Sequence, residues 1–125
     1  MKKMNGMYVD GFVLPVPRKK LKHYQKLATL SAKVWREHGA LEYVECVADD
    51  VQKGKVTSFP QSVKLKSGEV VVFAWAVYRS RAHRDRVMKK VMSDPRLMHL
   101  MSGDFDLPFD DMRMFWGGFK AFVSA

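Results

Sequence analysis

The sequence predicts an α+β fold in which helices cover one face of a four-stranded antiparallel sheet. Apolar, β-branched segments of strand length occur four times, and two stretches between them carry apolar residues at intervals of three and four. The 125 residues suffice for one domain, and a composition of 47% hydrophobic and 28% charged residues excludes a disordered chain. We therefore expect a single domain over residues 1–125, with 1–6 as a loose N-terminal extension.

The first half of the chain predicts a strand, a helix and a second strand. Residues 7–14 are β-branched and aromatic and stop at a Pro-Val-Pro sequence, so we expect the first strand there. Apolar residues at helical spacing, with lysines between them, predict an amphipathic helix from about residue 19 to 38 that ends at Gly39. Residues 41–48 predict the second strand.

The second half predicts two further strands and two further helices. Residues 52–68 are polar and irregular, with room for one helical turn, and the apolar run 70–78 predicts a central strand covered on both faces. Ser80 is the expected N-cap of the second long helix. A capped Pro predicts a short helix over 95–101, and the last strand is expected over 112–122.

The resulting order β-α-β-β-α-β is that of the ferredoxin-like fold, with its helices on one face of the sheet. No further layer of the chain covers the other face of the sheet. Both alternating sets of side chains on the first strand are nevertheless largely apolar, so apolar side chains would be exposed on that face. We therefore expect a homodimer in which two sheets pack face to face. The two sets are Met7, Val9 and Val13 on one side, and Tyr8, Phe12 and Leu14 on the other.

Charge and cysteine content narrow the choice of compartment and partners. The net charge of +9 is spread over the predicted helices and loops, so we expect a solvated basic surface that attracts anionic ligands and binds no specific nucleic acid. No apolar run is long enough to span a membrane, and no signal-peptide core follows the basic N-terminus. The lone Cys46 excludes an internal disulfide and cysteine-based zinc sites, and a cytoplasmic location is the expectation.

Several spaced motifs resemble the YbaA-like bacterial family of unknown function. The resemblance covers nearly the whole chain from Met7 onward. The motifs are Tyr8–Pro17, Val34–Tyr43, Thr57–Pro60, Val77–Asp85, Asp94–Arg96 and the ending that joins Arg113 to Gly117, Gly118 and Phe119.

The resemblance implies membership of the dimeric α+β barrel superfamily, in which two ferredoxin-like sheets pack face to face. That superfamily includes cofactor-free monooxygenases, haem-degrading enzymes, lactone isomerases and ligand-sensing domains without catalysis. The fold that it implies agrees with the one derived above. A function does not transfer with a fold, so it must be argued from a site.

Asp10 is the most unusual residue, a carboxylate within an apolar strand. Burying it without a partner is costly, so it needs a bonded partner or a raised pKa. Arg113, on the expected last strand, is the predicted partner because the first and last strands of this fold are neighbours. The alternative is that Asp10 is a general base or a ligand contact in a cavity.

Two histidines are the other candidates for proton transfer. His38 lies in the last turn of the first long helix, where it is expected to bond the free carbonyls. His83 precedes Val87 by four residues, so it is expected to be a hydrogen-bonded residue on the buried face of its helix. Neither has partners at a spacing typical of a metal site, and we expect no metal and no cofactor.

Trp35 and Trp75 are expected in the core, with the alternative that they line an apolar ligand pocket between helices and sheet. Arg113 is the third candidate for ligand binding. Two functions stay open: a homodimer that binds a small, partly apolar molecule, with cofactor-free catalysis undecided, and a non-catalytic ligand-sensing or protein-interaction module. A cavity that brings together Asp10, His38 or His83 would favour an enzyme.

Overall fold

The computed structural model describes residues 4–99 and 107–125. Its strands are β1 (Tyr8–Pro17), β2 (Glu42–Val47), β3 (Glu69–Tyr78) and β4 (Phe115–Lys120). Its helices are the 3₁₀ turn η1 (Arg18–Lys20), α1 (Leu21–Glu37), α2 (Phe59–Ser62), α3 (Arg81–Met92) and α4 (Pro95–Met98).

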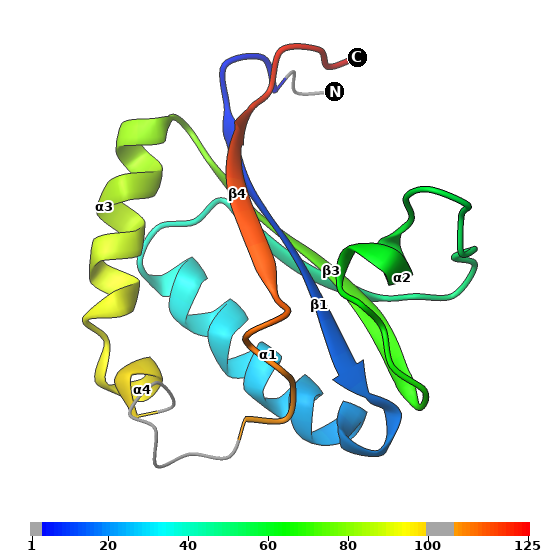
Figure 1. The fold of residues 1–125 in the computed structure, drawn as a ribbon. Helices are drawn as coiled ribbons and strands as arrows, with labels where there is room; N and C mark the ends of the chain where they lie inside the picture. The colour runs from blue at the N-terminus through cyan, green and yellow to red at the C-terminus, as the bar shows by residue number, and fades with distance from the viewer. Residues whose placement is uncertain (1–3, 100–106) are drawn as a thin grey trace.

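The four strands form one antiparallel sheet in the order β2-β3-β1-β4. The long helices α1 and α3 lie on the same face of this sheet (Figure 1). The ferredoxin-like α+β class predicted from the sequence is thus confirmed, including a central position for β3 and the pairing of β1 with β4.

The first strand is longer than predicted, because it runs through Pro15 to Pro17. Both prolines pair in register with β3, whereas β4 pairs only with the part of β1 that ends at Val13. One side of β1 is therefore free of a partner strand over the prolines, and a proline can sit in a strand where no ladder donor is needed.

The last strand is shorter than predicted and begins at Phe115 rather than Met112. The Asp110 carboxylate accepts hydrogen bonds from the backbone N–H of Met112 and from Arg113, which holds these residues in a turn before the strand. The short helix α4 ends at Met98 with His99 as its C-cap, and residues 100–101 of its predicted range lie outside the described residues.

The capping residues predicted from the sequence lie at the ends of the helices. Gly39 follows α1 with a φ of 117°, a conformation that glycine adopts without the steric cost of a Cβ. The Ser80 hydroxyl accepts a hydrogen bond from the backbone N–H of His83 and caps α3. The Asp94 carboxylate caps α4 through the backbone N–H of Arg96.

The main core lies between the helices and the sheet. The buried Ala76 and Tyr78 of β3 pack in one cluster with residues of both long helices, namely Val34 of α1 and Val87 and Val91 of α3. Even-numbered residues of β1 and β3 therefore point toward the helices. This alternation decides which strand residues can reach a site between the two layers.

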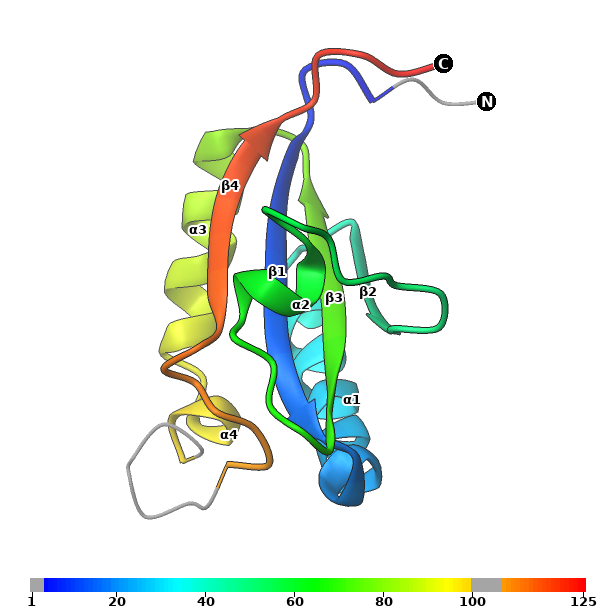
Figure 2. The same cartoon turned by 45° about the vertical axis from the view of Figure 1, so that its right-hand side comes forward.

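The opposite face of the sheet is only partly covered. The short helix α2 and its loops lie over one end of it, where Val63 packs against Val13 and Val71 (Figure 2). The ring of Phe59 on α2 contacts the Phe73 ring at a centroid distance of 5.8 Å, yet Phe73 and Phe119 remain 41% and 66% exposed. The predicted cover on both faces of β3 is therefore incomplete at Phe73 within the described protomer.

The described residues nearest the two ends of the chain lie at the same end of the sheet (Figure 2). Of the predicted loose extension, residues 1–3 are outside the described part, while Met4 donates to the Ser124 hydroxyl and Gly6 donates to the Ala121 carbonyl. No helix among the described residues is both long enough and apolar enough to cross a membrane.

Candidate functional site

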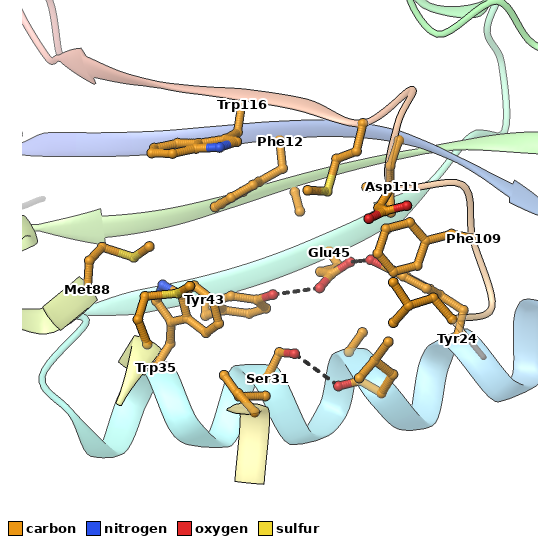
Figure 3. A pocket seen from close by; sticks show the side chains of 18 of the residues that line it. Phe12, Tyr24, Ser31, Trp35, Tyr43, Glu45, Met88, Phe109, Asp111 and Trp116 are labelled. Atoms are coloured by element: carbon orange, nitrogen blue, oxygen red, sulfur yellow. Dashed lines mark hydrogen bonds between the residues drawn. The ribbon is translucent and has the colours of Figure 1, made fainter. Parts of the chain in front are cut away.

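A cavity of about 700 Å³ lies between the helical layer and the sheet. Helices α1, α3 and α4, the strands β1, β2, β3 and β4, and the segment before β4 all contribute to its wall (Figure 3). Side chains of β1 and β2 that face the helices, such as Phe12 and Glu45, therefore meet residues of α1 across an open space.

Most of the cavity wall is apolar. Ring contacts connect its aromatic residues in pairs, with centroid distances of 5.3 Å for Trp35 and Tyr43 and 5.7 Å for Tyr24 and Phe109. Such a wall suits an apolar ligand body. Its aromatic members are Phe12, Tyr24, Trp35, Tyr43, Phe109 and Trp116, and its methionines are Met88, Met92, Met98 and Met114.

The main polar group of the cavity is the Glu45 carboxylate, held by two tyrosines. The Tyr24 hydroxyl donates a short hydrogen bond to Oε1, and the Tyr43 hydroxyl donates to Oε2 at 2.6 Å. The three side chains come from α1 and β2 and converge in the middle of the cavity (Figure 3). Tyr43 and Glu45 share a face of β2 because they are two residues apart.

Burial raises the pKa of the Tyr24 and Tyr43 hydroxyls well above the ordinary value of 10.0, and the nearby Glu45 charge raises both further. Both tyrosines therefore keep their protons at neutral pH. Each proton is directed at Glu45, so among the described residues the arrangement is a carboxylate with two neutral donors and no cation bonded to it.

Two further polar side chains of the wall use their hydrogens within the protein. The Ser31 hydroxyl donates to the carbonyl of Leu27 at 3.1 Å, which continues a helical turn of α1. The Trp35 indole Nε1 donates to the Tyr78 hydroxyl at 3.0 Å.

Asp10 lies outside the cavity and is paired with an arginine of α3. It is fully buried, and its Oδ1 lies 3.0 Å from Nη1 of Arg84, whose guanidinium stacks 4.9 Å from the centre of the Tyr8 ring. Burial raises the Asp10 pKa, while hydrogen bonding from Tyr78 and the Arg84 charge oppose that rise. The structural alternative of a paired carboxylate is therefore the one observed.

The predicted pairing of Asp10 with Arg113 is wrong, because Asp10 pairs with Arg84. The register of β1 and β4 places Gly118 opposite Asp10, and a Cβ on Gly118 would come within 2.3 Å of the Tyr8 hydroxyl. Glycine there leaves room for the Tyr8 side chain, and pairing continues on both sides of it without a bulge.

Arg113 instead anchors the turn before β4. Its Nη2 lies 2.6 Å from the Glu69 carboxylate and its Nε lies 2.8 Å from Asp110, while Nη1 donates to the carbonyls of Val63 and Lys64. The Arg113 hydrogen bond lowers the pKa of Glu69. None of these groups lines the cavity.

Both candidate histidines also lie outside the cavity wall. His38 ends α1 as predicted, but its Nε2 lies 2.8 Å from Asp94 rather than bonding the helix carbonyls. His83 is 8% exposed and its Nδ1 accepts a hydrogen bond from the backbone N–H of Arg79, so the expected hydrogen-bonded core role is confirmed. Burial lowers the pKa of His83.

The two candidate tryptophans lie on opposite faces of the sheet. Trp35 lines the cavity, whereas Trp75 points to the open face and donates from Nε1 to Glu42 at 2.8 Å. Within residues 4–99 and 107–125, no group of three His, Cys, Asp or Glu side chains is arranged to hold a metal ion.

The polar residues that do line the cavity, Tyr24, Tyr43 and Glu45, were not singled out from the sequence. A usable signal was present on β2. Glu42 and Glu45 are three residues apart, so a strand must send them to opposite faces, and one of the two carboxylates must meet the helices.

Comparisons with known proteins agree with the fold and supply no activity for the site. The model of the DUF1428 family, described as a protein of unknown function, matches residues 7–111. The uncharacterized protein YbaA of Escherichia coli K12 is 45% identical over 116 residues, which cover 93% of this chain and 97% of that protein. The YbaA protein of Shigella flexneri is equally similar.

Two solved structures share the fold at low sequence identity. SnoaB, a cofactor-independent oxygenase from Streptomyces nogalater, has a TM-score of 0.55 and 10% identity over 95% of this chain and 96% of its own. A dimeric ferredoxin-like protein from an uncultured marine organism has a TM-score of 0.54 and 9% identity over 99% and 98%. At these identities the similarity concerns the fold alone.

Proposed function

Since the chain belongs to the DUF1428 family, a family of unknown function, we propose from its own cavity that it binds a small, mostly apolar molecule. The cavity between helices and sheet carries this proposal. Its volume of about 700 Å³ is within the range of small-molecule sites, roughly 300–1,000 Å³, and its wall combines aromatic and methionine side chains with one convergent polar cluster.

A binding role is favoured over a catalytic one by the place of the titratable groups. Asp10, His38 and His83 do not line the cavity, and the Tyr24 and Tyr43 protons are held by Glu45 and by high pKa values. A general acid or base needs a pKa near the working pH to transfer protons efficiently. The oxygenase activity of SnoaB is a property of that protein.

The test fills the cavity and measures the loss of binding. N-phenyl-1-naphthylamine, a neutral dye that fluoresces in apolar sites, should bind the protein saturably, at one molecule per protomer. The variant Ala28→Trp places a large ring into the cavity wall from α1 and should weaken dye binding at least tenfold.

Ala82→Trp is the matched control, because it adds the same ring to the exposed side of α3, away from the cavity. It should bind the dye like the unmodified protein. Equal dye binding by Ala28→Trp, or the absence of saturable binding in the unmodified protein, would contradict the proposed function.

We also propose that the protein is a homodimer joined through the open face of the sheet. On this face β1, β3 and β4 present Val9, Phe73 and Phe119 and carry no charged side chain beyond Glu69 at the start of β3. The apolar, mostly uncharged patch formed by these strands can pack against the same patch of a second copy, as a two-fold interface requires. The relative described as a dimeric ferredoxin-like protein supports the same assembly.

Sedimentation or light scattering at micromolar concentration tests the dimer against the protomer mass of 14.4 kDa. The interface should bury roughly 2,000 Å² in total. Phe119→Glu places a charge within the proposed interface and should yield a monomer, whereas Val56→Glu, on an exposed loop, should leave the dimer intact. A monomeric unmodified protein would overturn the assembly and leave the cavity proposal standing.

We place the protein in the cytoplasm, on the ground that its single thiol, Cys46, is free and exposed. Fractionation of the producing cells checks this location, and recovery in an oxidising compartment would contradict it.

A further inference from the structure

The polar cluster of the cavity can accept hydrogen bonds but has no proton left to donate. A tyrosine hydroxyl carries one proton and two lone pairs. Tyr24 and Tyr43 both give that proton to Glu45, and each oxygen of the carboxylate keeps a further lone pair for another donor. A ligand group that reaches this cluster therefore meets only acceptors.

The other polar hydrogens of the cavity wall are either already donated to groups of the protein or lie away from Glu45. The Ser31 hydroxyl and the Trp35 indole both donate to groups of the protein itself. The Trp116 indole belongs to a half-exposed side chain on β4, at a different part of the cavity from Glu45 (Figure 3).

The charged side chains of the cavity wall also favour a ligand that donates hydrogen bonds. Glu45 and Asp111 are both lining residues, and no Lys, Arg or His is among the described side chains that line the cavity. Within residues 4–99 and 107–125, Glu45 also has no cation among its hydrogen-bond partners, unlike the carboxylates of Asp10, Glu69 and Asp94. An unpaired carboxylate at an apolar surface gains most from a ligand that brings the missing positive charge.

We propose that the cavity selects ligands with a hydrogen-bond donor on an apolar body, and protonated amines above all, with Glu45 and the hydroxyls of Tyr24 and Tyr43 as the acceptors. This inference rests on the proposed function, because it names the ligand class of the same cavity. It also reverses the preference for anions that the net charge of +9 suggested, since that charge lies on the outer surface and the wall carries carboxylates.

Three probes with one apolar body and different head groups test the selection. We would titrate 2-naphthylmethylamine, 2-naphthalenemethanol and 2-naphthoate at pH 7 and follow amide shifts of α1 and β2 by NMR. The amine should bind at least about tenfold tighter than the alcohol, and the alcohol tighter than the carboxylate, because only the amine brings a positive charge to Glu45 and only the carboxylate is repelled.

Glu45→Gln should lower amine affinity at least tenfold, to about that of the alcohol, and should weaken the alcohol much less, because only the amine loses an attraction between opposite charges. Glu42→Gln is the matched control, since it removes the same charge from the opposite face of β2 and should not change the order. The ranking in the unmodified protein tests the inference even if Glu45→Gln fails to fold.

Equal or tighter binding of 2-naphthoate, or an amine preference that survives Glu45→Gln, would overturn the inference. If the neutral dye binds the cavity while the three probes show no amine preference, the proposed function stands and only this inference fails. If neither the dye nor any probe binds in the cavity, the proposed function fails and the selection fails with it.

Discussion

Two carboxylates on the helix-facing side of the sheet have opposite surroundings. Asp10 on β1 is fully buried and contacts the Arg84 guanidinium at 3.0 Å, with Tyr8 packed beside it. Glu45 on β2 is partly buried and borders the cavity, and within the described part of the chain its hydrogen-bond partners are two neutral tyrosine hydroxyls. They are near each other on the sheet, since β3 places Ala76 opposite Asp10 and Ala74 opposite Glu45.

The difference shows how the partner of a buried carboxylate decides its role. A cation supplied by the protein neutralises the charge and closes the site, so Asp10 joins α3 to the sheet. Neutral donors hold Glu45 in position without neutralising it, so its charge stays available to a ligand. The predictions below test whether the two carboxylates differ in this way.

The largest effect is expected from Arg84→Met. It leaves the buried Asp10 without its cation, and breaking one side of a buried ion pair costs about 3–5 kcal/mol. Urea denaturation followed by circular dichroism measures the free energy of unfolding. A loss below about 1 kcal/mol would mean that the pair contributes little to holding α3 on the sheet.

Asp10→Asn should lower the free energy of unfolding by about 1–3 kcal/mol, since a charged hydrogen bond to Arg84 is replaced by a neutral one. The same denaturation experiment measures it, and the double variant with Arg84→Met should lose less than the sum of the two single losses. A stabilised Asn variant would show that Asp10 is a strained group rather than a structural one.

The pH dependence of the Asp10→Asn effect follows from the raised pKa of Asp10. Burial raises this pKa, so the folded protein binds the proton more tightly than the unfolded chain. The stability that Asp10 contributes should therefore rise as the pH falls through the raised pKa toward the ordinary value of 3.8. The measurement is the unfolding free energy of the unmodified protein minus that of Asp10→Asn. A difference that shrinks on acidification would show that Arg84 outweighs burial.

The smallest stability effect is expected from Glu45→Gln, within about 1 kcal/mol of the unmodified protein. The amide oxygen of Gln can still accept a hydrogen bond from Tyr24 or Tyr43, and no buried cation loses its partner. The midpoint of thermal unfolding measures this against Asp10→Asn. A loss as large as that of Asp10→Asn would make Glu45 a structural residue and remove the contrast.

The fold was predictable because its signals are local. Alternating and helical spacing, the cap at Ser80 and the glycine at position 39 each depend on a few neighbouring residues, and all four strands and both long helices follow from them. Strand ends were less predictable. The run of β1 through its prolines depends on where β4 stops pairing, which no local pattern contains.

The site was less predictable because it depends on how helices and strands meet. Asp10 could be recognised as a carboxylate that needs a partner, but its partner comes from α3. Arg84 precedes Met88 by four residues and Val91 by seven, which places it on the inner face of that helix, and this spacing was the overlooked signal. Glu45 was overlooked because its tyrosine partners include Tyr24, twenty-one residues away on another element.

The three tryptophans give the protein built-in optical reporters on both sides of the sheet. Trp35 and Trp116 border the cavity, whereas Trp75 is on the open face and is bonded to Glu42. Emission from the first two should respond to a ligand, and emission from Trp75 should respond to a second copy. Variants that keep a single tryptophan would therefore let fluorescence record ligand uptake in one variant and self-association in another.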